Sequence, residues 1–144
     1  MLVLGMNAWL FAENEFNRNV DESNNFKYFV IDNKKLNKRK ILTGDYLITY
    51  VTKIMKVTDV RKIISNQPKP IPPSIKYDRD FDCYLETELV KKLNKEDWID
   101  RKSVFPKLNI FENKIINLVL LSAPIKLDIK DSSIIFELFN LDLD

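Results

Sequence analysis

The segment 46–51 constrains the fold most, because its composition predicts a buried β-strand. Its sequence, Tyr-Leu-Ile-Thr-Tyr-Val, is apolar, aromatic or β-branched throughout, and such residues favour a strand over a helix. Gly44, one of only two glycines in the chain, lies just before it and can supply the positive φ of a tight turn. The segment 54–64 continues with further apolar residues and is predicted to form a second strand paired with the first.

Other short elements follow from local patterns. Strands are predicted at 8–12 and 28–31, a helical turn at 103–108, a buried apolar run at 115–121, and a final helix at 132–139 capped by Asp131. Four of the six prolines lie in the segment 66–74, which predicts an extended loop and neither a helix nor a central strand. Scattered strands and short helices favour an α+β fold over a βαβ array.

The segment 84–93 fits two patterns. Leu85, Leu89 and Leu93 recur every four residues, which favours a helix. Alternation fits a strand equally well, with Glu86 and Glu88 on one face. Local spacing leaves this choice open.

Length and composition predict one globular domain over 1–144. With 144 residues, 45% hydrophobic and 31% charged, the chain can bury a sizeable core. It has no histidine and a single cysteine, Cys83. These counts exclude Ser-His-Asp and Cys-His catalysis, an intrachain disulfide and multi-cysteine metal sites.

Charge is segregated along the chain although the total is only +2. Residues 1–26 carry a net charge of −3, residues 27–69 carry +8, and residues 70–144 carry −3. A local basic excess of this size can attract phosphates. A solvated lysine-rich surface would look the same.

No stretch reaches the ~18 apolar residues of a membrane span. The apolar start, residues 1–6, is too short for a signal sequence and has no basic region. A cytoplasmic protein without membrane contact is the expectation.

Four segments, taken in order, resemble the EVE domain, a PUA-like family related to YTH domains. They are Ala8-Trp9-Leu10 with the Asn-rich turn 13–17, Lys27-Tyr28-Phe29-Val30, the Gly-Asp turn and strand 44–50, and the segment 104–114 with its continuation 125–139. The family pattern differs at the second segment, where Tyr28-Phe29-Val30 stands for Trp-Gly-Val, and at the apolar run 115–121, which replaces a tryptophan.

The resemblance implies a bent β-barrel of five or six strands closed by short helices. It also implies that 84–93 is a barrel strand, and this is the prediction adopted for that segment. By position, Asn14 and Asn17 would address a base edge, Tyr28 or Phe29 would form one pocket wall, and Tyr77 would lie near a second wall. The basic residues Lys34, Lys35, Lys38, Arg39 and Lys40 would meet phosphates. Trp9 is predicted to be core.

The implied function is a non-catalytic module that binds DNA or RNA and reads a modified base, single-stranded or flipped, in an aromatic pocket. No cofactor or metal is expected. The alternative is a structural or partner-binding domain, oligomeric through its apolar segments. Catalysis by the acids Asp78, Asp80 and Asp82 has little support, because no second acidic motif accompanies them.

Overall fold

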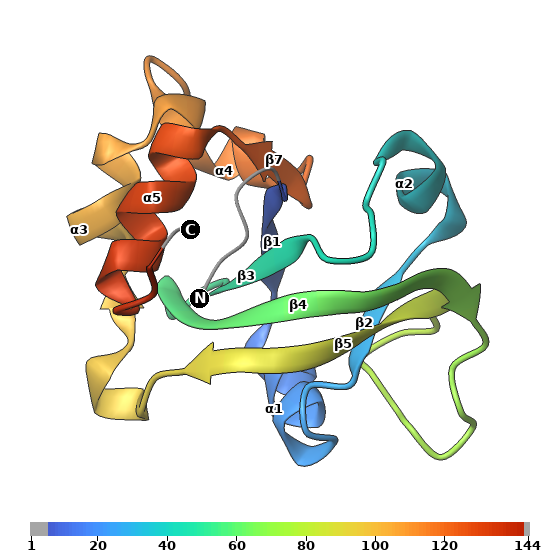
Figure 1. The fold of residues 1–144 in the computed structure, drawn as a ribbon. Coiled ribbons are helices and arrows are strands. Elements are labelled where there is room, and N and C mark those ends of the chain that lie inside the picture. The colour runs from blue at the N-terminus through green and yellow to red at the C-terminus, as the bar shows by residue number, and fades with distance from the viewer. Residues whose placement is uncertain (1–5, 143–144) are drawn as a thin grey trace.

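The computed structural model describes residues 6–142 and shows an α+β fold, as the sequence predicts (Figure 1). Its strands are β1 (Ala8–Glu13), β2 (Tyr28–Ile31), β3 (Tyr46–Val51), β4 (Lys56–Lys69), β5 (Cys83–Lys92), β6 (Ile99–Asp100) and β7 (Ile125–Leu127). Its α-helices are α1 (Glu15–Ser23), α2 (Asn33–Lys38), α3 (Arg101–Val104), α4 (Ile116–Leu120) and α5 (Ile129–Leu138), and its 3₁₀ turns are η1 (Lys95–Asp97), η2 (Phe105–Lys107) and η3 (Asn109–Phe111). Residues 1–5 of the apolar start lie outside the described part.

One seven-stranded sheet organises the molecule, in the order β2-β5-β4-β3-β1-β7 with β6 paired to β4. The pair β1–β3 is parallel, and the other pairs are antiparallel. Among the described strands β2 and β7 do not pair with each other, so the sheet is curved without closing into the full barrel. Helices α3, α4 and α5 gather on one side of it, while α1 lies on the opposite side (Figure 1).

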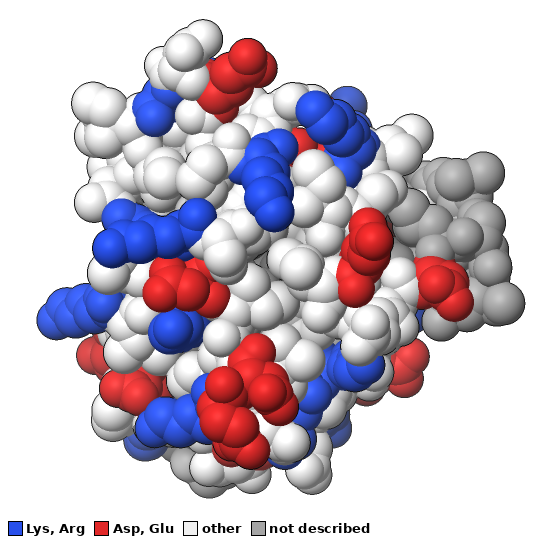
Figure 2. All heavy atoms as spheres, turned by 90° about the vertical axis from the view of Figure 1, so that its left-hand side faces the viewer, with Lys and Arg blue, Asp and Glu red and all other residues white. Residues whose placement is uncertain are grey.

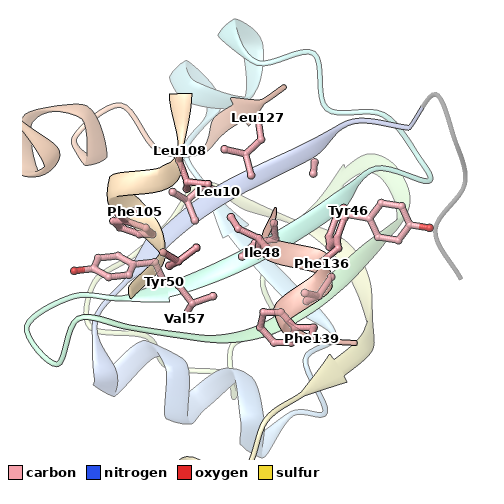
Figure 3. Packing of buried hydrophobic residues seen from close by; sticks show 14 of the residues in the cluster. Leu10, Tyr46, Ile48, Tyr50, Val57, Phe105, Leu108, Leu127, Phe136 and Phe139 are labelled. Atoms are coloured by element: carbon pink, nitrogen blue, oxygen red, sulfur yellow. The ribbon is translucent and has the colours of Figure 1, made fainter. Parts of the chain in front are cut away.

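Strand β3 explains the two-sided core. Tyr46, Ile48 and Tyr50 belong to one cluster, which α5 and the η2–η3 segment complete (Figure 3). Leu47, one position along, belongs to a second cluster on the other face. Because successive side chains of a strand point to opposite faces, a continuous apolar run indicates a strand covered on both sides.

The structure confirms several local predictions. Gly44 adopts a φ of 96° in the turn before β3. Trp9 is buried, and its indole Nε1 donates to Asp45 Oδ2 at 3.0 Å. The segment 84–93 is a strand: β5 pairs with both β2 and β4. Pairing on both sides stabilises it more than the leucine spacing could stabilise an isolated helix.

Three local predictions are wrong. The apolar run 115–121 is not buried as a whole, since Ile115, Leu118 and Leu121 are 67%, 59% and 73% exposed. The last helix begins earlier, because Asp128 caps it by accepting from the backbone N–H of Asp131. Asp131 instead accepts from the backbone N–H groups of Asn109 and Ile110, which ties α5 to η3.

The third error concerns the first part of the proline-rich segment, because β4 continues through Pro68 to Lys69, whereas 70–74 is irregular as predicted. Ile63 still exchanges backbone hydrogen bonds with Gly44 and Asp45, and beyond it β4 pairs irregularly with β5 alone. Proline is tolerated at such an edge position, where no ladder bond is lost.

Candidate nucleic-acid interface

A pocket of about 300 Å³ opens where the end of β1 meets the start of α1. Its wall combines apolar and polar side chains from β1, α1, β2, α2 and the segments 78–81 and 123–124: Phe11, Ala12, Glu13, Asn14, Asn17, Phe29, Val30, Ile31, Asp32, Lys35, Thr52, Asp78, Arg79, Phe81, Ala123 and Pro124. We call it the Asn14 pocket. Its volume is at the lower end of the range of ~300–1,000 Å³ for small-ligand sites.

Asn14 and Asn17 both line this pocket, and both side-chain amides are hydrogen-bonded to Asp78. Asn14 caps α1 by accepting from the backbone N–H of Asn17 at 2.8 Å, and its Nδ2 donates to Asp78 Oδ2 at 2.7 Å. Asn17 Nδ2 donates to Asp78 Oδ1 at 3.0 Å and its Oδ1 accepts from the Asp78 backbone N–H at 2.9 Å. Each amide oxygen therefore faces an N–H and each amide nitrogen a carboxylate, which fixes the orientation of both side chains.

Strand alternation separates the two aromatic residues of β2. Phe29 lines the Asn14 pocket and packs edge-to-face on Phe11, with ring centroids 4.9 Å apart. Tyr28 points to the other face, where its ring meets Tyr84 edge-to-face at 4.7 Å. Phe29 is thus the β2 aromatic at the pocket, and Tyr28 lies outside its lining.

Tyr77, predicted near the second wall, does not line the pocket, and Phe81 lies in the wall instead. The Tyr77 hydroxyl donates to Asp21 Oδ1 at 2.7 Å, and burial together with the Asp21 carboxylate raises the pKa of Tyr77 above its ordinary value. Phe81 contacts the Tyr77 ring edge-to-face. The Arg79 guanidinium lies over the Phe81 ring, with its Cζ 3.8 Å from the ring centroid. Arg79 in turn pairs with Asp32 at 2.7 Å.

The basic residues at 34–40 divide into two groups. Lys35 Nζ donates to the Ala123 carbonyl at 2.7 Å, and Arg39 Nε donates to the Pro124 carbonyl at 2.8 Å. Burial and the nearby Arg39 lower the pKa of Lys35. Lys34, Lys38 and Lys40 are exposed. By contrast, the face that carries α3 and α5 shows basic and acidic side chains interspersed (Figure 2).

A buried ionic cluster lies beside the pocket, between α1 and the sheet. Arg61, fully buried, contacts Glu13 at 3.0 Å, Asp21 at 2.8 Å and Asp59 at 3.0 Å. Arg18 reaches Asp59 at 3.0 Å. Thr49 and Thr58 hydroxyls also donate to Asp59, and the Phe26 ring lies under both guanidinium groups. The cluster anchors α1, whose first turn carries Asn14 and Asn17.

Charge within this cluster is unbalanced. Three buried carboxylates, those of Glu13, Asp21 and Asp59, face the two buried guanidinium groups. Burial and the Asp21 carboxylate raise the pKa of Glu13 well above its ordinary value, whereas Arg61 and Arg18 outweigh burial and hold the pKa of Asp59 below its ordinary value. Glu13 Oε1 is buried and has no hydrogen-bond partner among the described residues. Of Glu13 and Asp59, Glu13 is therefore the carboxylate that binds a proton more readily.

We expect Glu13→Gln to change the pH dependence of stability. Because the pKa of Glu13 is higher in the folded state, its protonated form stabilises the fold at low pH, and this contribution is lost as pH rises above the ordinary glutamate pKa of ~4.3. Glutamine imitates the protonated form, so the free energy of unfolding of the variant relative to wild type should rise with pH from mildly acidic to neutral conditions. Urea denaturation at several pH values measures this difference.

Glu22→Gln is the matched control with the opposite sign. The hydrogen bond from Arg18 lowers the pKa of the exposed Glu22, so its contribution is present at neutral pH and lost on acidification. The Glu22→Gln variant should therefore lose stability relative to wild type as pH rises. Parallel trends in the two variants would contradict the assignment of the proton to Glu13.

Groups suited to other chemistry are few in the described part of the chain. No three Cys, Asp or Glu side chains between residues 6 and 142 are placed to hold a metal ion. Burial and the neighbouring Asp82 raise the pKa of the Cys83 thiol, which contacts the Ile31 carbonyl. A raised pKa disfavours the reactive thiolate. None of the described helices combines the length and apolar character required to cross a membrane.

Comparison with solved structures places the fold among YTH domains, which are PUA-like. The YTH domain of Zygosaccharomyces rouxii MRB1, solved in complex with N6-methyladenosine RNA, superposes with a TM-score of 0.72 at 10% identity, covering 99% of this chain and 92% of that one. The Pho92 YTH domain in complex with m6A gives a TM-score of 0.71 at 11% identity, covering 99% and 91%. The Agrobacterium tumefaciens protein Atu2648 gives 0.56 at 16% identity, covering 93% and 91%. No family model and no curated protein sequence matches the chain.

Sequence reasoning missed Phe81, Asp78 as an amide partner, and the ionic cluster. A signal for the cluster was present in the strand pattern. Asp59 and Arg61 are interspersed with Val57, Val60 and Ile63 in a segment predicted to be a strand paired with 46–51. Charges within a predicted central strand indicate a buried pair, because an isolated buried charge is very costly. Phe81 and Asp78 had no comparable signal, since they lie in an irregular segment.

Proposed function

We propose that this protein is a non-catalytic nucleic-acid-binding module that reads a modified base, single-stranded or flipped, in the Asn14 pocket. Within the PUA-like fold we assign it to the EVE-type readers, on the four sequence segments that resemble that family. The observation that carries the proposal is the coincidence of oriented amides and aromatic side chains in one nucleobase-sized pocket. Asn14, Asn17, Phe29 and Phe81 form this combination.

The chemistry of these residues suits a base. Side-chain amides offer the hydrogen-bonding groups that base edges complement. Stacking of a base on an aromatic ring contributes ~1–3 kcal/mol. The apolar side chains Phe11 and Ile31, which also line the pocket, would accept an added methyl group. A YTH domain of similar fold solved in complex with N6-methyladenosine RNA, and a second solved in complex with m6A, support RNA as the first partner to test.

Phosphate contacts are assigned to α2 and the residues that follow it. Lys34, Lys38 and Lys40 are exposed. Lys35 lines the pocket and uses one of its three donors on the Ala123 carbonyl. Arg39 supports the pocket wall through Pro124. We expect binding to weaken with salt, because each phosphate contact releases counterions.

The test is fluorescence anisotropy with labelled single-stranded 9-mers. RNA with one central N6-methyladenosine should bind at micromolar or lower protein concentration and at least ~10-fold more tightly than the unmodified RNA, a difference of ~1.4 kcal/mol. DNA of the same sequence with a central N6-methyldeoxyadenosine tests the other polymer. Raising the salt from about 50 to about 200 mM should weaken every complex. Traces that stay flat for all probes would refute the nucleic-acid function.

A second candidate function is partner binding through α4. Leu118 on α4 and the residues at its two ends, Ile115 and Leu121, are exposed apolar side chains, the kind of surface that marks protein contacts. This candidate predicts a dimer or larger species in sedimentation experiments. Loss of that species in Leu118→Ser, together with flat anisotropy traces, would favour it over the reader.

A further inference from the structure

A second cavity adjoins the Asn14 pocket on the other side of the β1 end. It has a volume of about 410 Å³ and lies between the β3–β4 turn, α3 and α4. Ala12 and Thr52 line both cavities, and the Thr52 backbone N–H donates to the Glu13 carbonyl at 2.8 Å. The two cavities are therefore adjacent, with the backbone at Ala12 and Thr52 between them. We call this second space the Tyr50 cavity.

The lining of the Tyr50 cavity is an apolar floor with cations at the edge. Met55, Leu120 and Leu121 supply the apolar surface, and Tyr50, whose ring is buried in the core cluster, turns its hydroxyl away from that cluster at the bottom of the cavity (Figure 3). Lys53 and Arg101 supply the charge. Among residues 6–142 no carboxylate forms an ion pair with either of these two cations.

Hydrogen bonds hold Arg101 in place, and a turn brings Lys53 to the edge of the cavity. Arg101 Nη1 donates to the Tyr50 hydroxyl at 3.1 Å and to Asn117 Oδ1 at 3.0 Å, while no described residue accepts from its Nη2. Lys53 is exposed at the tip of the β3–β4 turn. Lys53 and Met55 have φ angles of 67° and 58°, a left-handed conformation that non-glycine residues rarely adopt. This turn directs both residues to the cavity.

We propose that the Tyr50 cavity binds the nucleotide adjacent to the one whose base enters the Asn14 pocket. The neighbouring base would lie on Met55, Leu120 and Leu121, and the connecting phosphate would meet Lys53 and Arg101. Consecutive nucleotides fit two adjacent cavities, and their phosphate complements the two cations. A carboxylate-bearing peptide has no reason to occupy both cavities at once. This inference rests on the proposed function.

The experiment compares a nucleoside with a trinucleotide by titration calorimetry. The probes are N6-methyladenosine and the RNA trimer uridine–N6-methyladenosine–uridine. Wild type should bind the trimer at least ~10-fold more tightly than the nucleoside. Lys53→Glu and Arg101→Gln should leave nucleoside affinity unchanged and remove most of the gain from the flanking nucleotides.

Controls separate this effect from folding and from bulk charge. Lys107→Glu changes an exposed lysine that lines neither cavity, and it should keep the full gain. The Lys53 side chain has no hydrogen-bond partner among the described residues, so Lys53→Glu should fold normally. It therefore keeps the test valid even if Arg101→Gln has a folding defect. Equal trimer-to-nucleoside ratios in wild type and Lys53→Glu would overturn the second site while sparing the reader. Absence of nucleoside and trimer binding in wild type would overturn both.

Discussion

Arg61→Leu is expected to destabilise the protein by about 3–5 kcal/mol, the usual cost of removing one partner from a buried ion pair. The variant leaves Glu13, Asp21 and Asp59 buried without the guanidinium that all three contact. Urea denaturation followed by tryptophan fluorescence measures the loss, and a protein that fails to fold without denaturant is the upper limit of the same outcome.

Arg79→Gln is the matched control for that variant. Its ion pair with Asp32 is as short as the Arg61 contacts, but both side chains are partly exposed. Exposed pairs contribute ~0–1 kcal/mol. A similar loss in the two variants would show that the buried cluster does not carry the stability assigned to it.

Phe81→Ala is expected to weaken binding of the N6-methyladenosine 9-mer by about 1–3 kcal/mol, the range for removing one stacking partner of a base. That range corresponds to roughly 5- to 150-fold in affinity. Phe81 is half-buried, so the fold should tolerate the change better than it would tolerate loss of the fully buried Phe29. Anisotropy titration measures the effect, with thermal melting as the check on folding.

Phe16→Ala is the aromatic control for Phe81→Ala. Phe16 lies on α1 close to the pocket in sequence, is 56% exposed and does not line the pocket. Its loss should leave affinity unchanged. If Phe81→Ala binds as tightly as wild type, Phe81 is misassigned as a stacking partner of the base.

The ionic cluster and the Asn14 pocket are connected through α1 and residues 77–78. Arg18 and Asp21 lie on α1 and bind Asp59 and Arg61 of β4, while Asn14 and Asn17 in the first turn of α1 hold Asp78. The hydroxyl of Tyr77, the residue before Asp78, donates a hydrogen bond to Asp21 on α1. The amides are therefore positioned by buried charge contacts rather than by the loop alone, which is a form of preorganisation.

Part of the site could be predicted from sequence. Asn14 precedes a helical segment, and an asparagine there is expected at an N-cap, where its side chain meets the backbone of the first turn. Phe29 and Tyr28 are neighbours in a strand, so one of the two had to face away from any pocket. Strand alternation alone does not say which face carries the pocket; the pairing of β2 with β5 decides that.

By itself the sequence determined the elements whose signal is local and periodic. The segment 46–51 is a strand covered on both faces because apolar residues occupy both its odd and its even positions. Gly44 forms the turn before this strand because glycine tolerates a positive φ. Tertiary structure alone decided the rest. The segment 83–92 became a strand through two neighbouring strands, and Asp78 reached Asn14 across 64 positions. The run 115–121 forms a short helix of which only one side, Ile116, Val119 and Leu120, packs against the core. Contacts between distant segments depend on how the whole chain packs, and a local pattern carries no information about them.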